Sequence, residues 1–169
     1  MAEIVIAGPG QHLAAIRELF HEYLAWGGAR IGEEFNLTFD IPAMIEGDMR
    51  TLEKYLPPRG RLLLGYADGQ VAGIACLKEL APTIGEVKRM YVRPAARGRG
   101  LGRALLDRLL AEARTIGYER VRLDSARFMA EAHRLYRAAG FREIEPYAGS
   151  QILEFRQHWV FMEISLTKG

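Results

Sequence analysis

The chain has 169 residues, of which 49% are hydrophobic and 26% are charged, and its formal net charge is +2. This balance is typical of one soluble domain over residues 1–169, and it argues against a disordered chain, a coiled coil or a general nucleic-acid-binding protein. No apolar run is long enough to cross a bilayer, the first residues do not resemble a signal peptide, and Cys76 is the one cysteine. We therefore expect a cytoplasmic protein without a membrane partner or an intrachain disulfide.

A strand and a helix are predicted first. Residues 3–7 predict a short strand, and residues 11–26 carry apolar side chains at helical spacing, which predicts an amphipathic helix. Gly27 and Gly28 are expected to end this helix, because glycine is common just after the last helical residue. Residues 29–40 show no clear period, so we expect a loop there.

A second helix is predicted from Asp40, whose side chain can cap the first turn. Pro42 fits that turn because the first helical N–H groups have no partner within the helix. The helix is expected to run to Leu52, and residues 56–60, which contain two prolines and a glycine, stop it.

Three strands are predicted next. Residues 61–66 and 70–78 form a hairpin, because the turn between them contains the Asp68-Gly69 pair that favours tight hairpin turns. Residues 84–92 form the following strand.

Helices and strands alternate in the second half of the chain. A helix opened by a glycine-rich turn is expected to reach about Ile116, before Gly117. The remaining predicted elements are a strand over residues 119–124, a helix over 129–139, and strands over 141–144 and 158–166. Residues 145–157 give no clear prediction. The order β-α-α-β-β-β-α-β-α-β-β predicts an α/β sandwich around a mixed sheet.

The glycine-rich turn is the segment Arg97-Gly98-Arg99-Gly100-Leu101-Gly102. It follows the strand over residues 84–92 and opens a helix, so unpaired backbone N–H groups and the positive end of the helix dipole face outward there. Glycines let a ligand approach the backbone closely, and the arginines add positive charge. These features predict a site for a ligand that carries phosphate.

Other interpretations of this turn are weaker. It is not a Walker A loop, because no Gly-Lys-Ser/Thr follows the glycines. Asp124 lies where a Rossmann fold would place its ribose-binding acid, but glycines at positions 98, 100 and 102 do not complete the G-x-G-x-x-G pattern. A surface loop with turn-forming glycines is the remaining structural explanation.

The chain resembles the GNAT superfamily of acyl-CoA-dependent N-acetyltransferases. Arg97, Gly100 and Gly102 match the family's Q/R-x-x-G-x-G/A signature, residues 90–94 resemble the end of the strand before it, and residues 135–141 match the family's L-Y-x-x-x-G-F segment. The resemblance implies a mixed, mostly antiparallel sheet flanked by helices. It also implies direct transfer of an acetyl group from acetyl-CoA to a primary amine, without a covalent enzyme intermediate.

The resemblance assigns cofactor-binding residues. It places the pantetheine arm in a gap opened by a bulge in the fourth strand, against the main chain of Met90, Tyr91 and Val92, where the Val92 N–H can polarise the thioester carbonyl. It places the CoA pyrophosphate on the glycine turn. The residues implied there are Arg97, Gly98, Arg99, Gly100, Leu101, Gly102, Arg103 and Ala104, with the arginines adding charge-assisted contacts or remaining solvated.

Two residues are candidates for proton transfer. Tyr136 can donate a proton to the leaving sulfur, because a thiol's pKa of about 8.5 lies below a phenol's of about 10. The structural explanation of Tyr136 is an aromatic on the inner face of a helix. Glu86 lies where relatives often carry a base that acts directly or through water, although it could also pair with Lys88 or Arg61 as an ordinary strand residue.

Several further residues complete the expectations. Met129 stands where many relatives have a cofactor-binding Asn, so no cofactor role is carried onto it. Asp124 and Ser125 are expected either to line the cofactor cleft or to cap the next helix. The histidines at positions 12, 21, 133 and 158 form no metal-ligand cluster, so no metal is expected.

The acceptor is expected to be a small-molecule or peptide amine, bound by residues 26–40 and 147–159. Glu33 and Glu34 could attract a cationic amine or form a solvated acidic loop. Many relatives are dimers, so the resemblance also allows a homodimer. The alternatives are a non-catalytic acyl-CoA-binding or sensing module and a small nucleotide-binding oxidoreductase.

Overall fold

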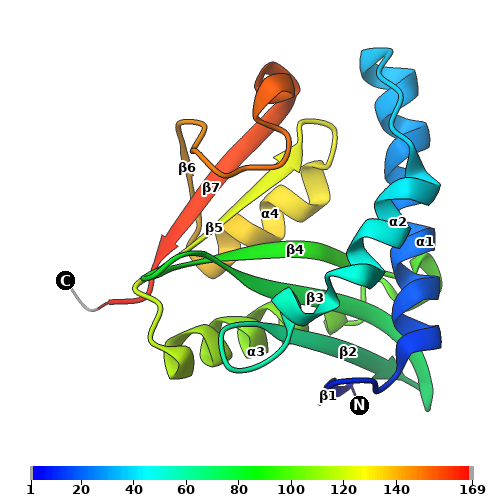
Figure 1. Cartoon of the computed structure of the whole chain (residues 1–169), viewed down its shortest axis with the longest axis vertical. Helices are drawn as coiled ribbons and strands as arrows, with labels where there is room; N and C mark the ends of the chain where they lie inside the picture. The colour runs from blue at the N-terminus through cyan, green and yellow to red at the C-terminus, as the bar shows by residue number, and fades with distance from the viewer. Residues whose placement is uncertain (1, 168–169) are drawn as a thin grey trace.

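The computed structural model describes residues 2–167, which contain one seven-stranded sheet in the order β1-β2-β3-β4-β5-β7-β6 (Figure 1). The strands are β1 (Glu3–Ile6), β2 (Arg61–Ala67), β3 (Gln70–Ala81), β4 (Ile84–Val92), β5 (Arg120–Ala126), β6 (Arg142–Ile144) and β7 (Trp159–Ser165). Neighbouring strands run antiparallel except β4 and β5, which are parallel. This confirms the expected mixed, mostly antiparallel sheet.

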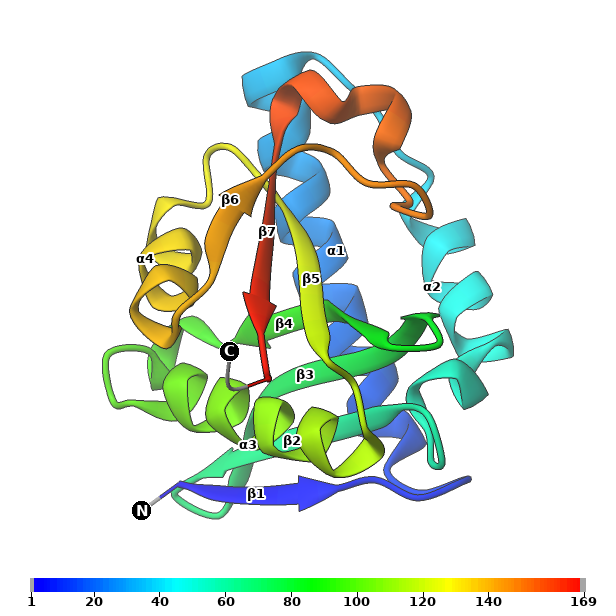
Figure 2. The ribbon, with the colours of Figure 1, turned by 90° about the vertical axis from the view of Figure 1, so that its left-hand side faces the viewer.

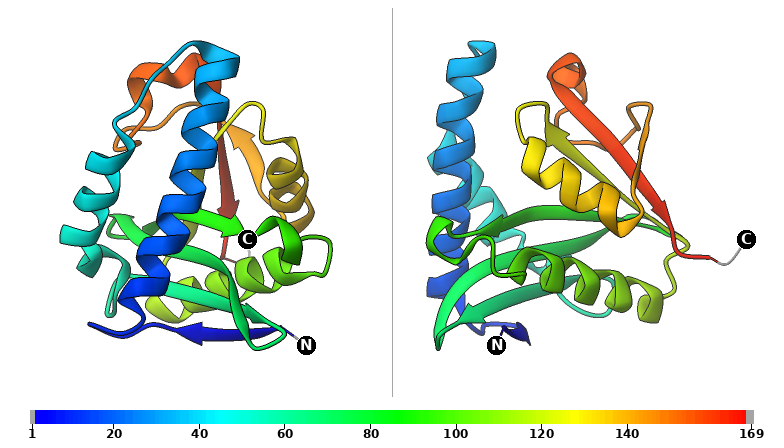
Figure 3. Two further views of the ribbon diagram at one scale, coloured as in Figure 1. Left: turned by 90° about the vertical axis from the view of Figure 1, so that its right-hand side faces the viewer. Right: turned by 180° about the vertical axis from the view of Figure 1, so that it is seen from behind.

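Helices cover both faces of the sheet. They are α1 (Leu13–Phe35), α2 (Ile41–Arg50), α3 (Leu101–Ile116) and α4 (Ala130–Ala139), with short 3-10 turns at Leu52–Tyr55, Pro94–Ala96 and Leu153–His158. α3 lies in front of β2 and β3 in Figure 2, and α1 lies in front of the sheet in the left view of Figure 3. No helix within residues 2–167 is long and apolar enough to cross a membrane.

Strand alternation divides the core between these two layers. Val121 and Leu123 of β5 pack with Leu105 of α3 in one cluster of buried side chains. Phe20 of α1 packs with Leu64 of β2 in a second cluster on the opposite face. Successive residues of a strand point to opposite faces, so β2, β3 and β4 each contribute to both clusters.

The predicted end of the first helix is wrong. α1 continues through Gly27 and Gly28 to Phe35, so most of the expected loop over residues 29–40 is helical. A Cβ on Gly28 would lie 2.9 Å from Ile41 Cδ1, so this glycine permits close approach of the start of α2. Ile31 and Phe35 pack in a third core cluster with Trp159, and this long-range packing outweighs the low helix propensity of glycine.

Local signals predicted other boundaries correctly. The Asp40 side chain accepts a hydrogen bond from the Ala43 N–H at 3.1 Å and caps α2. Gly117 and Gly140 end α3 and α4 in the left-handed conformation. The segment that gave no prediction, residues 145–157, includes most of the 3-10 turn before β7.

A β-bulge in β4 opens the middle of the sheet. Lys88 pairs with Cys76 and Tyr91 with Ile74, so two residues of β4 oppose one of β3. Arg89, in this bulge, has a φ of 54°. A bulge bends its strand and increases its twist. The pairing of β4 with β5 runs only from Ile84↔Arg120 to Glu86↔Arg122, and the two strands part beyond it.

Candidate active site

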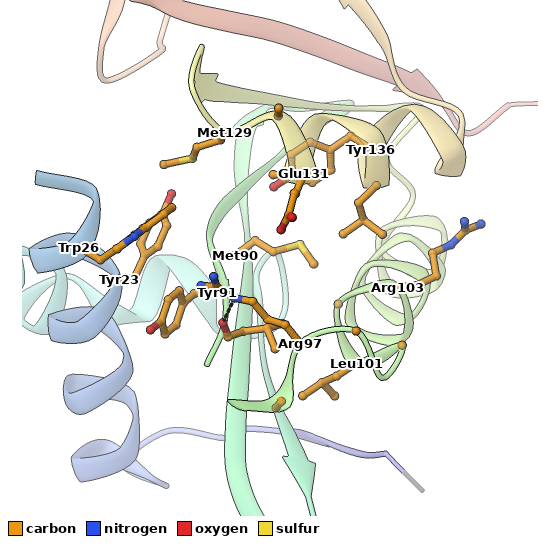
Figure 4. A pocket seen from close by; sticks show the side chains of 18 of the residues that line it. Tyr23, Trp26, Met90, Tyr91, Arg97, Leu101, Arg103, Met129, Glu131 and Tyr136 are labelled. Atoms are coloured by element: carbon orange, nitrogen blue, oxygen red, sulfur yellow. Dashed lines mark hydrogen bonds between the residues drawn. The ribbon is translucent and has the colours of Figure 1, made fainter. Parts of the chain in front are cut away.

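A cleft of about 630 Å³ lies between α1, the end of β4, the N-terminus of α3 and α4 (Figure 4). We call it the large cleft. Tyr136 lines it, together with most of the predicted cofactor residues, namely Met90, Tyr91, Val92, Arg97, Gly98, Gly100, Leu101, Gly102 and Arg103. The structure therefore brings the two sequence motifs to one cavity, although they lie more than thirty residues apart in the chain.

The glycine turn presents free main-chain donors to this cleft. Gly98 and Gly100 have φ values of 76° and 85°, which other residues rarely adopt. The first N–H bonded within α3 is that of Ala104, which donates to the Gly100 carbonyl at 3.0 Å. The N–H groups at positions 100–103 therefore have no helical partner, and they point outward at the positive end of the helix dipole. This arrangement suits an anion.

The two arginines of the turn and Arg103, which follows it, differ in their surroundings. Arg97 lines the cleft, donates from Nε to the Val92 carbonyl at 2.8 Å, and lies 5.7 Å from the ring centre of Trp26. Arg103 also lines it, but its Nε donates to Asp107 at 2.9 Å and its side chain points away from Met90 in Figure 4.

Arg99 is not among the lining residues. Its guanidinium donates two hydrogen bonds, of 2.9 and 3.0 Å, to the Asp68 carboxylate in the hairpin turn. Ala104 also lies outside the lining, with its N–H already bonded within α3. Trp26, expected at the acceptor end, borders the large cleft instead.

The end of β4 directs main-chain amides away from β3. The Arg93 N–H donates to the Ala72 carbonyl of β3 at 2.8 Å. Hydrogen-bonding groups alternate in direction along a strand, so the N–H groups of Val92 and Met90 point toward the space between β4 and β5. Both expected amide donors therefore belong to residues that line the large cleft, and Met90 also lines the opening made by the bulge.

A small cavity of about 60 Å³ occupies this opening and is called the gap. Met90 and Tyr136 line both the gap and the large cleft. Burial raises the pKa of the Tyr136 phenol above its usual range, and the neighbouring Tyr23 and Asp124 raise it further. No hydrogen bond within residues 2–167 occupies the Tyr136 hydroxyl. The hydroxyl is therefore a neutral donor at the junction of the two cavities.

Glu86 is buried away from these cavities. Its carboxylate accepts a hydrogen bond of 2.7 Å from the Tyr147 hydroxyl, and Lys78 Nζ lies 3.6 Å from its other oxygen. The ion pair is with Lys78, so the expected pairing with Lys88 or Arg61 is wrong. Burial and the Glu86 charge raise the pKa of Tyr147. A role of Glu86 as the base stays a prediction.

A second cleft, of about 260 Å³, lies on the other side of the gap. Residues of both predicted acceptor segments line it, including Ile31, Phe39 and Trp159. Its lining includes the charged or polar residues Lys88, Arg89, Asp124, Ser125 and Gln151, and Tyr23 also lines it. Glu33 and Glu34 are absent from its lining and form ion pairs with Arg30 on α1.

Asp124 and Ser125 line this second cleft and the gap, and neither caps α4. The N-cap of α4 is Met129, without a side-chain cap. Ser125 Oγ lies 3.0 Å from His133 Nε2 instead.

The comparison with protein families decides the class of this protein. Residues 16–141 match the model of the acetyltransferase (GNAT) family, which is more than half of the chain. The chain belongs to the GNAT family. The motifs of the glycine turn and of α4 both lie within the matched region, so the resemblance found in the sequence is confirmed. This GNAT protein is an acyltransferase.

Relatives and solved structures agree with this assignment. An uncharacterized N-acetyltransferase of Schizosaccharomyces pombe is 29% identical over 160 residues, which cover 94% of this chain and 91% of the relative. A GNAT acetyltransferase from Staphylococcus aureus Mu50 has a TM-score of 0.75 at 20% identity, covering 99% of this chain and 100% of that one. An acetyltransferase from Salmonella typhimurium, solved with its cofactor acetyl-CoA, has a TM-score of 0.67 at 24% identity, covering 100% and 96%. These two structures share the fold.

Sequence reasoning missed Lys88 as a wall residue of the second cleft in this GNAT protein, and it assigned Asp124 and Ser125 to the cofactor cleft or to a helix cap. Lys88 follows Glu86 in β4 and Asp124 follows Arg122 in β5 at a spacing of two residues, and this alternation of charged and apolar residues was the available signal for a polar face. The departure at Met129 is also informative, because this side chain lines the large cleft, the gap and the second cleft. A thioether in place of an amide makes the junction of the three cavities more apolar.

Proposed function

We propose that this GNAT protein transfers the acetyl group of acetyl-CoA directly to an amine in a ternary complex. The observation that carries the proposal is the continuity of the three cavities. Tyr23 and Met129 line all of them, and the gap shares Tyr136 with the large cleft and Asp124 with the second cleft. Donor and acceptor can therefore meet in the gap, which lowers the entropic part of the barrier.

The donor would lie along the large cleft. The N–H groups at positions 100–103 would bind the diphosphate, with Arg97 adding charge and Arg99 and Arg103 close by. The pantetheine arm would follow the main chain of β4 at Met90 and Val92. Its thioester would then lie where the large cleft meets the gap, and the N–H of Val92, which lines the large cleft, would stabilise the negative charge that develops on the carbonyl oxygen.

The reaction then needs one proton donor and one proton acceptor. The amine nitrogen loses a proton and attacks the thioester carbon, and the carbon–sulfur bond breaks with its electron pair on sulfur. Tyr136 would donate its proton to that sulfur, which supports departure of the thiol. Glu86 is one candidate for the proton acceptor, acting through water. Residues 1–169 would form the single domain that carries out this reaction.

The test combines turnover with binding. The protein is mixed with acetyl-CoA and a broad panel of primary amines, and release of free thiol is followed. We expect release that depends on the amine and saturates with acetyl-CoA. Tight CoA binding by calorimetry without turnover on any amine would indicate a binding or sensing module. Thermal stabilisation by NAD instead of CoA would indicate an oxidoreductase.

A further inference from the structure

Two opposite charges face each other across the parting strands. The last paired residues of β4 and β5 are Glu86 and Arg122, so Lys88 and Asp124 are the next pair in register on the same face. Lys88 Nζ lies 3.9 Å from Asp124 Oδ2, and each side chain is 8% exposed. Both side chains line the gap and the second cleft.

The Lys88 ammonium has no hydrogen-bond acceptor within residues 2–167, although it carries three N–H donors. Within residues 2–167, every fully buried side-chain nitrogen or oxygen has a hydrogen-bond partner. Because Lys88 Nζ has none, this nitrogen is not fully buried and is accessible from the cavity that its side chain lines. A buried ammonium is costly unless it is paired and hydrogen-bonded. Lys88 therefore offers unused donors to a ligand in the second cleft.

Only one of the two carboxylate oxygens of Asp124 accepts a hydrogen bond. Its Oδ2 accepts a hydrogen bond of 2.9 Å from Ser150 Oγ, whereas Oδ1 has no hydrogen bond within the described chain and is open to the cavity by the same reasoning. The other cation in the lining, Arg89, is already bound to Asp48 at 2.7 Å. The second cleft therefore presents one available cation and one available carboxylate oxygen, side by side.

The rest of the second cleft is mostly apolar and small. Its walls include Leu24, Ile31, Phe39, Ile41, Met44 and Trp159. Its volume of about 260 Å³ lies below the range of about 300–1,000 Å³ that drug-sized ligands occupy. A compact ligand with an apolar body fits these walls, because burial of apolar surface is favourable.

We propose that the second cleft binds the acceptor and that the acceptor is an α-amino acid with an apolar side chain. This proposal rests on the acetyl transfer proposed above. Asp124 binds the ammonium and Lys88 binds the carboxylate. The zwitterion brings one charge of each sign, so both available protein charges gain a partner and the net charge of the site does not change.

The position of Asp124 gives it a chemical role. It lines the gap together with Tyr136, so the bound nitrogen lies beside the thioester. The ammonium gives one proton to Asp124, and the nitrogen attacks the carbonyl carbon as the carbon–sulfur bond breaks. Tyr136 gives its proton to the sulfur and regains one from the new amide nitrogen. The products are the N-acetyl amino acid, CoA and one proton, which Asp124 passes to solvent.

The experiment compares amino acids with the amines that lack only the carboxylate. The probes are L-phenylalanine with phenethylamine and L-leucine with isoamylamine, together with L-aspartate and a polyamine. We expect kcat/KM for the two apolar amino acids to exceed that of their amines by about tenfold or more, because a charge-assisted hydrogen bond is lost. L-aspartate, with a charged side chain, should be a poor acceptor.

Variants separate the two charges. Lys88→Met should remove the preference for the amino acid, so that the ratio of kcat/KM for L-phenylalanine to that for phenethylamine falls toward one. Asp124→Asn should lower the rate with both, by about tenfold or more. The control is the exposed ion pair of Arg17 and Glu46, away from the clefts, so Arg17→Met and Glu46→Gln should keep the wild-type preference. Acetyl-CoA affinity by calorimetry should stay the same in all four variants.

The outcomes distinguish this proposal from the proposed function. The plain amines or the polyamine could instead be acetylated as fast as the amino acids or faster, with rates that Lys88→Met does not change. This result would overturn the amino acid as the acceptor, but it would still support acetyl transfer. Wild-type turnover in Asp124→Asn would overturn the role of Asp124. Absence of turnover on every amine, despite acetyl-CoA binding, would contradict acetyl transfer itself.

Discussion

Asp48 of α2 and Arg89 of β4 form a buried ion pair, with Asp48 Oδ2 2.7 Å from Arg89 Nε. Arg89 lies in the β-bulge and has a positive φ, and Lys54 binds the other oxygen of Asp48 at 3.1 Å. The pair thus ties α2 to the residue that bends β4. Since the bulge sets the direction of the Met90 and Val92 amides, we expect the ion pair to hold the main-chain donors of the candidate site in place.

Asp48→Asn should destabilise the fold and slow acetyl transfer. Removing one partner of a buried ion pair leaves the other charge uncompensated, at a cost of about 3–5 kcal/mol. We expect a loss of about 3 kcal/mol in the free energy of unfolding by urea denaturation, and a lower kcat. Glu46→Gln, on the exposed face of the same helix, should change stability by less than about 1 kcal/mol. Equal stability of the two variants would contradict this role of Asp48.

Gly100→Glu should abolish CoA binding. The substitution puts a side chain at a φ of 85° and a negative charge beside the free N–H groups of α3. We expect affinity by calorimetry to fall by about a hundredfold or more, which corresponds to about 2.7 kcal/mol. Gly10→Glu is the control, because Gly10 has a φ of 74° and equally open space. Similar losses in both variants would show that backbone strain, and not the turn, is responsible.

Tyr136→Phe should lower kcat about a hundredfold and change acetyl-CoA affinity little, because proton donation matters in the transition state. Steady-state kinetics and calorimetry separate the two effects. Tyr118→Phe removes a buried hydroxyl that donates to the Arg59 carbonyl at 2.7 Å, and it should keep kcat. Unchanged turnover in Tyr136→Phe would remove Tyr136 as the acid.

His133 should make stability depend on pH. Burial, followed by the nearby Arg137, lowers the pKa of His133 below its usual value of 6.5. The unfolded chain therefore binds the proton more readily than the folded one, and stability contributed by this residue is present above pH 6.5 and is lost as the pH falls toward the folded pKa. In urea titrations between pH 5 and 8, His133→Gln should show a smaller fall in stability at low pH than the wild type. An identical pH dependence in the two proteins would contradict this effect.

Gly27→Ala and Gly28→Ala should differ, although the two glycines are neighbours in α1. A Cβ at Gly27 meets nothing within 4 Å, whereas one at Gly28 would lie 2.9 Å from Ile41 Cδ1. We expect Gly27→Ala to raise the free energy of unfolding by about 0.5–1 kcal/mol, because alanine favours helix. Gly28→Ala should gain less or lose stability. If Gly28→Ala were the more stable of the two variants in urea denaturation, close packing of Gly28 against Ile41 would not limit the size of the residue at position 28.

The sequence predicted what depends on neighbours in the chain and missed what depends on distant ones. Asp40 caps its helix and the glycine turn opens α3 through local backbone geometry, so both were predictable. The extension of α1 depends on Trp159, far along the chain, and the pairing of Arg99 depends on Asp68 in the hairpin. The Lys88–Asp124 pair depends on the register of two strands that are parallel neighbours only after folding.

The parting of β4 and β5 has a further consequence. In most sheets the unpaired main-chain groups lie on the edge strands, which are often short or covered by other segments. Here such groups lie in the interior of the sheet, between strands on either side. We expect a ligand arm that carries amides of its own to hydrogen-bond across this opening, so that the bound substrate extends the pairing of β4 and β5 beyond residues 84–86 and its release leaves those main-chain groups unpaired again.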